Sequence, residues 1–170
     1  MNFVVVMGVA GCGKSSAGQA LAHGLGLPLI EGDEYHPSGN LAKMRRGLPL
    51  TDADRAQWLA TLAQALTTHS AGAVLACSAL KRAYRDRLRM GAPGLRFVFL
   101  DIDQQTAHGR VAARAGQHLF PPSLVESQFA TLESPVGEPG VLRVDATLPL
   151  AGLSEYVIQW LRDTPVEAQT

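Results

Sequence analysis

The chain has 170 residues, a formal net charge of zero and a hydrophobic share of 46%. This length predicts a single domain, 1–170, with one core, and the neutral charge provides no basic field for nucleic acid and no polybasic membrane patch. The two cysteines, Cys12 and Cys77, indicate neither a disulfide framework nor a zinc site, so we expect a reducing, cytoplasmic environment. No apolar stretch is long enough for a membrane span or a signal sequence, and a soluble protein is expected.

Short apolar runs alternate with helical stretches along the chain. The predicted strands are residues 3–7, 29–31, 73–77, 97–100 and 141–144. Nearly all-apolar strands separated by helices are typical of a parallel sheet that helices cover on both faces. The predicted fold class is therefore α/β, a three-layer αβα arrangement around a five-stranded parallel sheet.

Two segments are larger than simple strand connections need. Residues 38–70 are predicted to hold a short basic helix and a second helix that opens at Thr51 with a capping-box pattern and buries Trp58 in the core. We expect this helical insertion to form a wall over a substrate pocket. Residues 110–123 contain two arginines with glycine and proline hinges, which predicts a lid.

The first predicted strand runs directly into Gly8-Val9-Ala10-Gly11-Cys12-Gly13-Lys14-Ser15. This segment fits the G-x-x-x-x-G-K-[ST] phosphate-binding loop, with the strand and helix that the motif requires on either side. Its glycines allow backbone N–H groups to face a phosphate at a helix N-terminus. We expect the loop and Ser16 to bind ATP, with Lys14 on the β- and γ-phosphates and the Ser15 hydroxyl on Mg²⁺.

A phosphate-binding loop predicts nucleotide binding but does not specify a reaction. Three classes compete: a small-molecule kinase, a GTPase-type switch, and an ATPase that drives a partner. A guanine-specific switch carries an Asn/Thr-Lys-x-Asp element, which this sequence lacks. Mechanical ATPases carry an acidic pair after an apolar strand, where this chain has Cys77-Ser78. The sequence therefore favours a small kinase.

Four further blocks extend the pattern. They are Glu-Gly-Asp-x-x-His-Pro at 31–37, Lys-Met-x-x-Gly-x-Pro-Leu-x-Asp-x-Asp-Arg-x-x-Trp-Leu at 43–59, Cys-Ser-Ala-Leu-Lys-x-x-Tyr-Arg-Asp-x-Leu-Arg at 77–89 and Ser-Gln-Phe-x-Thr-Leu-Glu at 127–133. Together with the phosphate-binding loop, these blocks resemble the gluconokinase family over nearly the whole chain. The resemblance implies a P-loop kinase fold with strand order 2-3-1-4-5. It also implies Mg²⁺-dependent transfer of phosphate from ATP to the 6-hydroxyl of D-gluconate by a cytoplasmic homodimer.

Two alternatives to this interpretation stay open. One is a shikimate-type or other sugar-acid kinase on the same scaffold, and the other is a nucleotide-switch module that is not an enzyme. Between Arg114 and His118 the chain holds one residue more than the family pattern, which concerns the register of the lid and not the reaction.

The second predicted strand ends in one carboxylate, Glu31, and a second carboxylate, Asp33, follows it. Asp33 is the candidate for orienting and deprotonating the acceptor hydroxyl, and its ordinary alternative is an Asx turn or a helix cap. Glu31 lies on the same side of the strand as Asp33. By similarity to the Asp-x-Asp of shikimate kinase it is a candidate for holding a Mg²⁺-bound water, and a plain strand-end carboxylate is the alternative.

Polar residues throughout these blocks are candidates for acceptor binding. Arg55 and Lys43 compete for the gluconate carboxylate, and Arg55 has the advantage of a bidentate fork. Lys81 and Arg85 lie one helical turn apart and are expected to face one anion together. The alternative for Arg55 and Lys43 is a solvated helix face, and a second alternative for Arg55 is pairing with Asp52 three residues earlier. The full set expected to contact the acceptor is Asp33, His36, Lys43, Arg55, Ser78, Lys81, Arg85 and Gln128.

Arg110 and Arg114 resemble the lid arginines of related kinases. Arg114 is expected to clamp the transferring phosphoryl group and Arg110 to stack on adenine, which the loop 145–149 would cradle. The alternative is that both are ordinary solvated residues. The predicted catalytic set is therefore Lys14, Asp33 and Arg114.

Overall fold

The computed structural model describes residues 2–114 and 121–166 of the chain. In chain order its elements are β1 (Asn2–Met7), α1 (Lys14–Leu25), β2 (Leu29–Glu31), the 3₁₀ helix η1 (Gly32–Tyr35), α2 (Ser38–Arg45), α3 (Asp52–Thr67), β3 (Gly72–Ala76), α4 (Arg82–Gly91), β4 (Arg96–Asp101), α5 (Gln104–Ala113), α6 (Leu124–Thr131), β5 (Val141–Asp145) and α7 (Leu150–Asp163). Every predicted strand is present, and the bounds differ from the prediction by no more than one residue at either end.

The strands form one parallel sheet in the order β2-β3-β1-β4-β5. The central strand β1 places Val5 beside Leu75 of β3 and Phe97 of β4. This arrangement confirms the predicted fold class and the strand order that the family resemblance implied.

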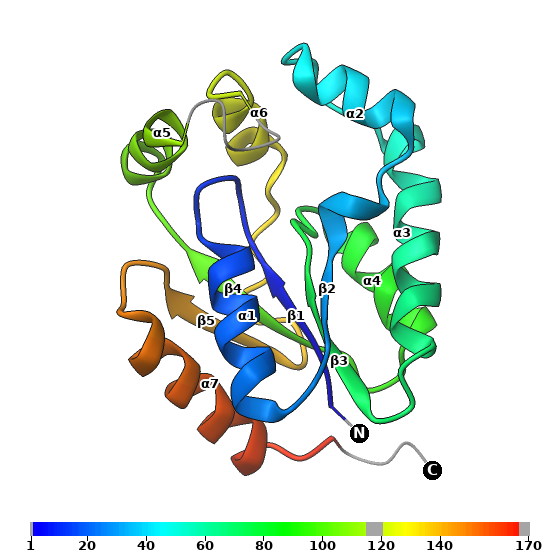
Figure 1. Cartoon of the computed structure of the whole chain (residues 1–170), viewed down its shortest axis with the longest axis vertical. Coiled ribbons are helices and arrows are strands. Elements are labelled where there is room, and N and C mark those ends of the chain that lie inside the picture. The colour runs from blue at the N-terminus through cyan, green and yellow to red at the C-terminus, as the bar shows by residue number, and fades with distance from the viewer. Residues whose placement is uncertain (1, 115–120, 167–170) are drawn as a thin grey trace.

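Side chains of β1 alternate between two hydrophobic cores because successive residues of a strand point to opposite faces of the sheet. Val4 and Val6 pack with residues of α1 and α7, whereas Val5 and Met7 pack with residues of α3 and α4. Figure 1 shows the sheet between these two pairs of helices. The predicted three layers are therefore present, and all-apolar strands are explained by burial on both faces.

The helix ends follow local signals. The hydroxyl Oγ1 of Thr51 accepts from the Asp54 N–H at 3.2 Å, and the Asp54 carboxylate accepts from the Thr51 N–H at 2.9 Å, so the capping box of α3 is confirmed. Helix α1 ends at Leu25, and the capping residue Gly26 has a φ of 65°, the left-handed conformation that glycine adopts most readily.

The carboxyl ends of the parallel strands share one edge of the sheet, and α2, α5 and α6 lie beyond that edge (Figure 1). Residues 38–70 contain α2 and α3, so the expected insertion is helical. The expected lid falls partly on residues 115–120, which include His118 and lie outside the described part of the chain. Within residues 2–114 and 121–166, no helix is both long and apolar enough to cross a bilayer.

Candidate active site

The phosphate-binding loop joins the end of β1 to the start of α1. Gly8, Gly11 and Gly13 have φ values of 148°, 84° and 90°, which L side chains rarely adopt. A Cβ at Gly11 would lie 2.7 Å from the carbonyl oxygen of Ala107 on α5, so the loop and α5 pack closely only because this residue is glycine. No side chain caps the first N–H groups of α1, which therefore remain available to an anion.

Lys14 lies across the loop that precedes it. Its ammonium Nζ donates to the carbonyl oxygens of Gly8 and Val9, at 3.1 Å in each case. These two contacts hold the positive charge over the ring of backbone N–H groups, where the outer phosphates of a nucleotide would lie.

Ser15 and Glu31 come together at the start of α1 and the end of β2. The Ser15 hydroxyl donates to the Glu31 carboxylate at 2.9 Å. Hydroxyl and carboxylate oxygens are suitable ligands for Mg²⁺, which kinases hold with one or two protein groups, substrate phosphates and water. In the described residues no cluster of three or more acidic, cysteine or histidine side chains could hold a metal by itself, so an Mg²⁺ ion at Ser15 and Glu31 would also need phosphate and water oxygens. The residues present fit the ion.

A pocket at the mouth of the loop contains all three residues of the predicted catalytic set. Asp33 enters it from η1, which directly follows β2, and Arg114 enters it from the C-terminal end of α5. The remaining lining residues all belong to the loop and the start of α1: Gly11, Gly13, Lys14, Ser15 and Ser16. Three side chains that are far apart in the sequence therefore surround the position expected for the transferred phosphoryl group.

Arg110 connects the loop to the segment after β5. Its guanidinium donates to the carbonyl oxygens of Gly11 and Ala146, both at 3.2 Å. A second pocket lies beside this guanidinium and is lined by Cys12, Gly13, Ser16, Ala17, Leu100, Arg110, Arg114, Ala146, Leu148, Leu150 and Leu153. This pocket combines leucine and alanine side chains with polar groups and lies next to the phosphate-binding loop. It is the candidate site for the nucleotide base, which the sequence analysis assigned to the loop 145–149, and that assignment stays a prediction.

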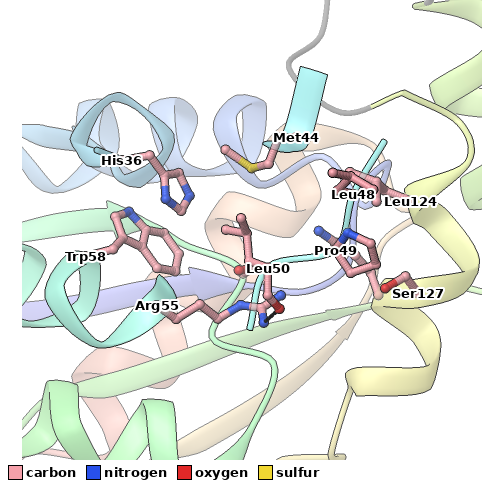
Figure 2. A pocket seen from close by; sticks show the side chains of 11 residues that line it. His36, Met44, Leu48, Pro49, Leu50, Arg55, Trp58, Leu124 and Ser127 are labelled. Atoms are coloured by element: carbon pink, nitrogen blue, oxygen red, sulfur yellow. Dashed lines mark hydrogen bonds between the residues drawn. The ribbon is translucent and has the colours of Figure 1, made fainter. Parts of the chain in front are cut away.

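A third pocket (Figure 2) is joined to the phosphate-binding loop through its lining residue Gln128, which accepts a hydrogen bond from the Ala10 N–H. Helices α2 and α6 and the loop before α3 supply its apolar wall, formed by Met44, Leu48, Pro49, Leu50 and Leu124. The remaining lining residues carry polar groups: His36, Arg55, Trp58, Ser78, Ser127 and Gln128. A pocket with one apolar wall and several convergent hydrogen-bonding groups suits a small polar substrate. We call it the acceptor pocket, and we call the pocket at the mouth of the loop, with Lys14, Asp33 and Arg114, the phosphate pocket.

His36 lies between this pocket and the phosphate pocket. Its ring stacks on Trp58, with ring centroids 4.1 Å apart and planes inclined by 15° (Figure 2). Burial lowers the pKa of His36 to about 4, so the ring is neutral at pH 7. Its Nε2 is 4.0 Å from the carboxylate oxygen Oδ1 of Asp33. His36 and Asp33 therefore connect the two pockets.

Trp58 is both a core residue and part of the pocket wall. Only 2% of its surface is exposed, which confirms the prediction that it belongs to the core. Its indole Nε1 donates to the carbonyl oxygen of Gly32 at 2.7 Å, so α3 is attached to the turn that carries Asp33.

The structure distinguishes between the two residues that were predicted to bind the carboxylate of the acceptor, Arg55 and Lys43. Arg55 lines the acceptor pocket, and its guanidinium donates to the carbonyl oxygen of Leu50 and lies 5.5 Å from the ring centroid of Tyr84. Lys43 does not line the pocket. Its ammonium contacts the Asp54 carboxylate at 2.7 Å, and this contact lowers the pKa of Asp54 to about 2.

Lys81 and Arg85 do not face a common anion, which corrects the prediction made from their helical spacing. Lys81 pairs with Asp52 at 3.0 Å on the surface. Arg85 is completely buried, and Nε of its guanidinium donates to the Glu138 carboxylate at 3.1 Å. Its Nη1 donates to the carbonyl oxygen of Ala79 at 2.8 Å. All of these partners belong to the protein, so Arg85 stabilises the loop after β3 and lies outside the candidate site.

Backbone and side-chain contacts attach the acceptor pocket to the phosphate-binding loop. The carbonyl oxygen of Ser78 accepts from the Gly8 N–H at 3.3 Å, and the side-chain oxygen of Gln128 accepts from the Ala10 N–H at 2.7 Å. Ser127, which the sequence analysis did not single out, lines the pocket beside Gln128. Its position in the 127–133 block was the available signal.

These features define a class of protein. The phosphate-binding loop lies at the carboxyl edge of a parallel sheet of order 2-3-1-4-5, with Arg114 in the same pocket and an acceptor pocket next to it. This combination is typical of a P-loop kinase. Residues 3–139 also match a family model described as an AAA domain.

Named relatives give the family. The chain is 47% identical over 146 residues to the gluconokinase of Gluconobacter oxydans (strain 621H), covering 84% of this chain and 82% of that protein. It is 40% identical to the thermoresistant gluconokinase of Escherichia coli (strain K12), covering 95% and 94%. The crystal structure of a gluconokinase from Sinorhizobium meliloti 1021 superposes with a TM-score of 0.86 at 46% identity, covering 95% and 92%. The chain belongs to the gluconokinase family and is a kinase.

Proposed function

We propose that this chain transfers the γ-phosphoryl group of ATP to the 6-hydroxyl of D-gluconate, giving 6-phospho-D-gluconate and ADP. The family supports the reaction, and one observation of the site supports it further. The acceptor pocket and the phosphate pocket meet at Asp33 and His36, whose nearest polar atoms are 4.0 Å apart. An acceptor hydroxyl at this junction would have a carboxylate on one side and the phosphate-binding loop on the other.

The chemistry needs positioning and charge stabilisation more than covalent help. The acceptor oxygen forms a bond to the γ-phosphorus while the bond between that phosphorus and the β–γ bridging oxygen breaks, and the hydroxyl proton passes to Asp33. Lys14 and the loop N–H groups stabilise the charge on the phosphates, and Arg114, which lines the same pocket, stabilises the charge of the transition state. Ser15, and Glu31 through a water molecule, would hold Mg²⁺, which would supply further neutralisation of phosphate charge.

The acceptor pocket matches the groups of a linear sugar acid. Arg55 is the proposed partner of the carboxylate, because it is the arginine that lines the pocket and its planar fork fits a carboxylate oxygen pair. His36, Ser78, Ser127 and Gln128 are the proposed partners of the hydroxyl groups. Shikimate is a rigid ring with fewer hydroxyls than gluconate, and we place it behind gluconate as the alternative acceptor.

Two expectations taken from the sequence remain part of the proposal. They are a cytoplasmic location and assembly as a homodimer, and their support is the resemblance to the gluconokinase family. Analytical ultracentrifugation of the purified chain tests the homodimer directly, since a monomer at micromolar concentration would contradict it.

An acceptor panel tests the function. ADP release is measured by a coupled assay with ATP and D-gluconate, with other sugar acids, and with shikimate and nucleoside monophosphates as controls. We expect turnover with gluconate and an almost complete loss of it in Lys14→Ala, whereas Arg162→Ala, which removes an exposed cation of α7, should keep it. Turnover with a different acceptor would overturn the substrate, and activity of Lys14→Ala within tenfold of the unmodified protein would overturn the role of the loop.

A further inference from the structure

Asn40 of α2 is a buried polar residue next to the acceptor pocket that the sequence motifs did not single out. Only 6% of its surface is exposed. Its side-chain nitrogen Nδ2 lies 2.9 Å from the carbonyl oxygen of Asp54 and 3.3 Å from the ring nitrogen Nδ1 of His36. One amide group therefore contacts the backbone of α3 and a histidine of the pocket at the same time.

These two contacts determine which nitrogen of His36 carries the proton. A backbone carbonyl oxygen can only accept a hydrogen bond, so the Asn40 atom beside Asp54 must be the NH₂ nitrogen. The same NH₂ group directs its second hydrogen at His36. Because that group is a donor, Nδ1 of His36 must accept and has no proton of its own. In a neutral ring the proton is then on Nε2.

The surroundings keep the ring neutral. His36 is stacked on Trp58 and buried, and burial disfavours the imidazolium. Two charged groups face it from the packed elements: Asp33 from η1, which favours protonation, and Arg55 from α3, which opposes it. Burial outweighs the attraction of Asp33, so no second proton binds to Nδ1 near pH 7.

We propose that Asn40 is a positioning residue that holds His36 as the Nε2–H tautomer, so that this N–H donates a hydrogen bond to a hydroxyl of the acceptor beside Asp33. This inference rests on the proposed function. The distance of 4.0 Å between Nε2 and the Asp33 carboxylate is too long for a direct hydrogen bond. A hydroxyl between them accepts from His36 and donates its own proton to Asp33. The other tautomer would present a lone pair there and compete with Asp33 for that proton.

The tautomer is measured on the unmodified protein by long-range ¹H–¹⁵N NMR correlation at pH 7 after ¹⁵N-histidine labelling. The chain has five histidines, and the His36 signals are assigned by their loss in His36→Gln. We expect an unprotonated Nδ1 and a protonated Nε2. A spectrum with a protonated Nδ1 would overturn the proposal, and this result does not depend on which sugar acid is the substrate.

Two variants then test the role of Asn40. In Asn40→Ala the tautomer should become mixed, and kcat/KM for the acceptor should fall about tenfold, the loss of roughly one hydrogen bond, while KM for ATP stays unchanged. In Asn40→Asp the new carboxylate can only accept, so Nδ1 becomes protonated and the His36 pKa rises. This variant should keep activity at low pH, where both ring nitrogens carry protons, and lose it as pH rises. A tautomer that is unchanged in Asn40→Ala, or equal losses in both KM values, would show that Asn40 is merely structural. If gluconate fails as a substrate and the tautomer is as expected, only the proposed function is wrong.

Discussion

The side-chain oxygen of Gln128 accepts a buried hydrogen bond of 2.7 Å from the backbone N–H of Ala10. This contact joins α6, which borders the acceptor pocket, to the middle of the phosphate-binding loop, 118 residues away in the sequence. The shape of the loop is therefore coupled to a wall of the acceptor pocket.

Gln128→Ala should weaken catalysis through this contact. It leaves the buried Ala10 N–H without its partner, which costs about 1–3 kcal/mol, and we expect kcat/KM to fall by about tenfold or more. Gln128→Glu is the matched control, because it keeps the acceptor atom but adds a negative charge near the phosphates, so its loss should appear mainly in KM for ATP. Unchanged kinetics in Gln128→Ala would refute the coupling.

Asp33→Asn should lower kcat far more than it weakens ATP binding. The amide cannot take the acceptor proton, and general-base catalysis contributes on the order of 10²-fold or more. Nucleotide affinity, measured by titration calorimetry, should stay close to that of the unmodified protein. The opposite pattern, with normal kcat and weak ATP binding, would assign Asp33 to the nucleotide.

Arg114→Ala should lower kcat by about 10³-fold, the effect of an arginine that stabilises phosphoryl-transfer charge. The side chain is exposed, so the thermal midpoint should not change. Arg162→Ala, another exposed arginine, is the control. If both variants keep full kcat, Arg114 is an ordinary surface residue.

Arg55 and Lys43 can be distinguished by steady-state kinetics with gluconate. Arg55→Lys keeps the charge but loses the planar fork, and KM for gluconate should rise about tenfold. Lys43→Ala should have a smaller effect, since its ammonium already pairs with Asp54 at 2.7 Å on the surface. A larger increase in KM for gluconate in Lys43→Ala would assign the binding of the gluconate carboxylate to Lys43. The thermal midpoint of both variants is measured as well, so that a change in gluconate binding can be told apart from a loss of folding stability.

His36 should make folding stability depend on pH. Its pKa falls from 6.5 to about 4 on folding, so between these values the unfolded chain binds a proton that the folded chain does not. The contribution of His36 to the free energy of unfolding is therefore fully present above about pH 6.5 and is lost as the pH falls toward 4. The free energy of unfolding is measured with urea at pH 7 and at pH 4.5. Its decrease between these two pH values should be smaller for His36→Gln than for the unmodified protein. Equal differences would mean that the ring is not buried as a neutral group.

Much of this fold follows from patterns that are local in the chain. All-apolar strands, the glycine-rich loop after β1 and the Thr51 capping box depend on residues a few positions apart, and the structure contains each of them. Periodicity and backbone geometry act over one or two turns, so the amino acids alone indicate where helices and strands begin and end.

The roles of the charged and polar side chains required the folded chain. Arg55 and Arg85 both lie on helices of the recognised blocks, yet one lines a pocket and the other is buried against Glu138, 53 residues further along. Asn40 acts on His36 only because Asp54 of α3 holds its amide group. Burial and long-range partners decide whether a polar group faces a substrate or the protein itself, and both arise only when distant segments pack together.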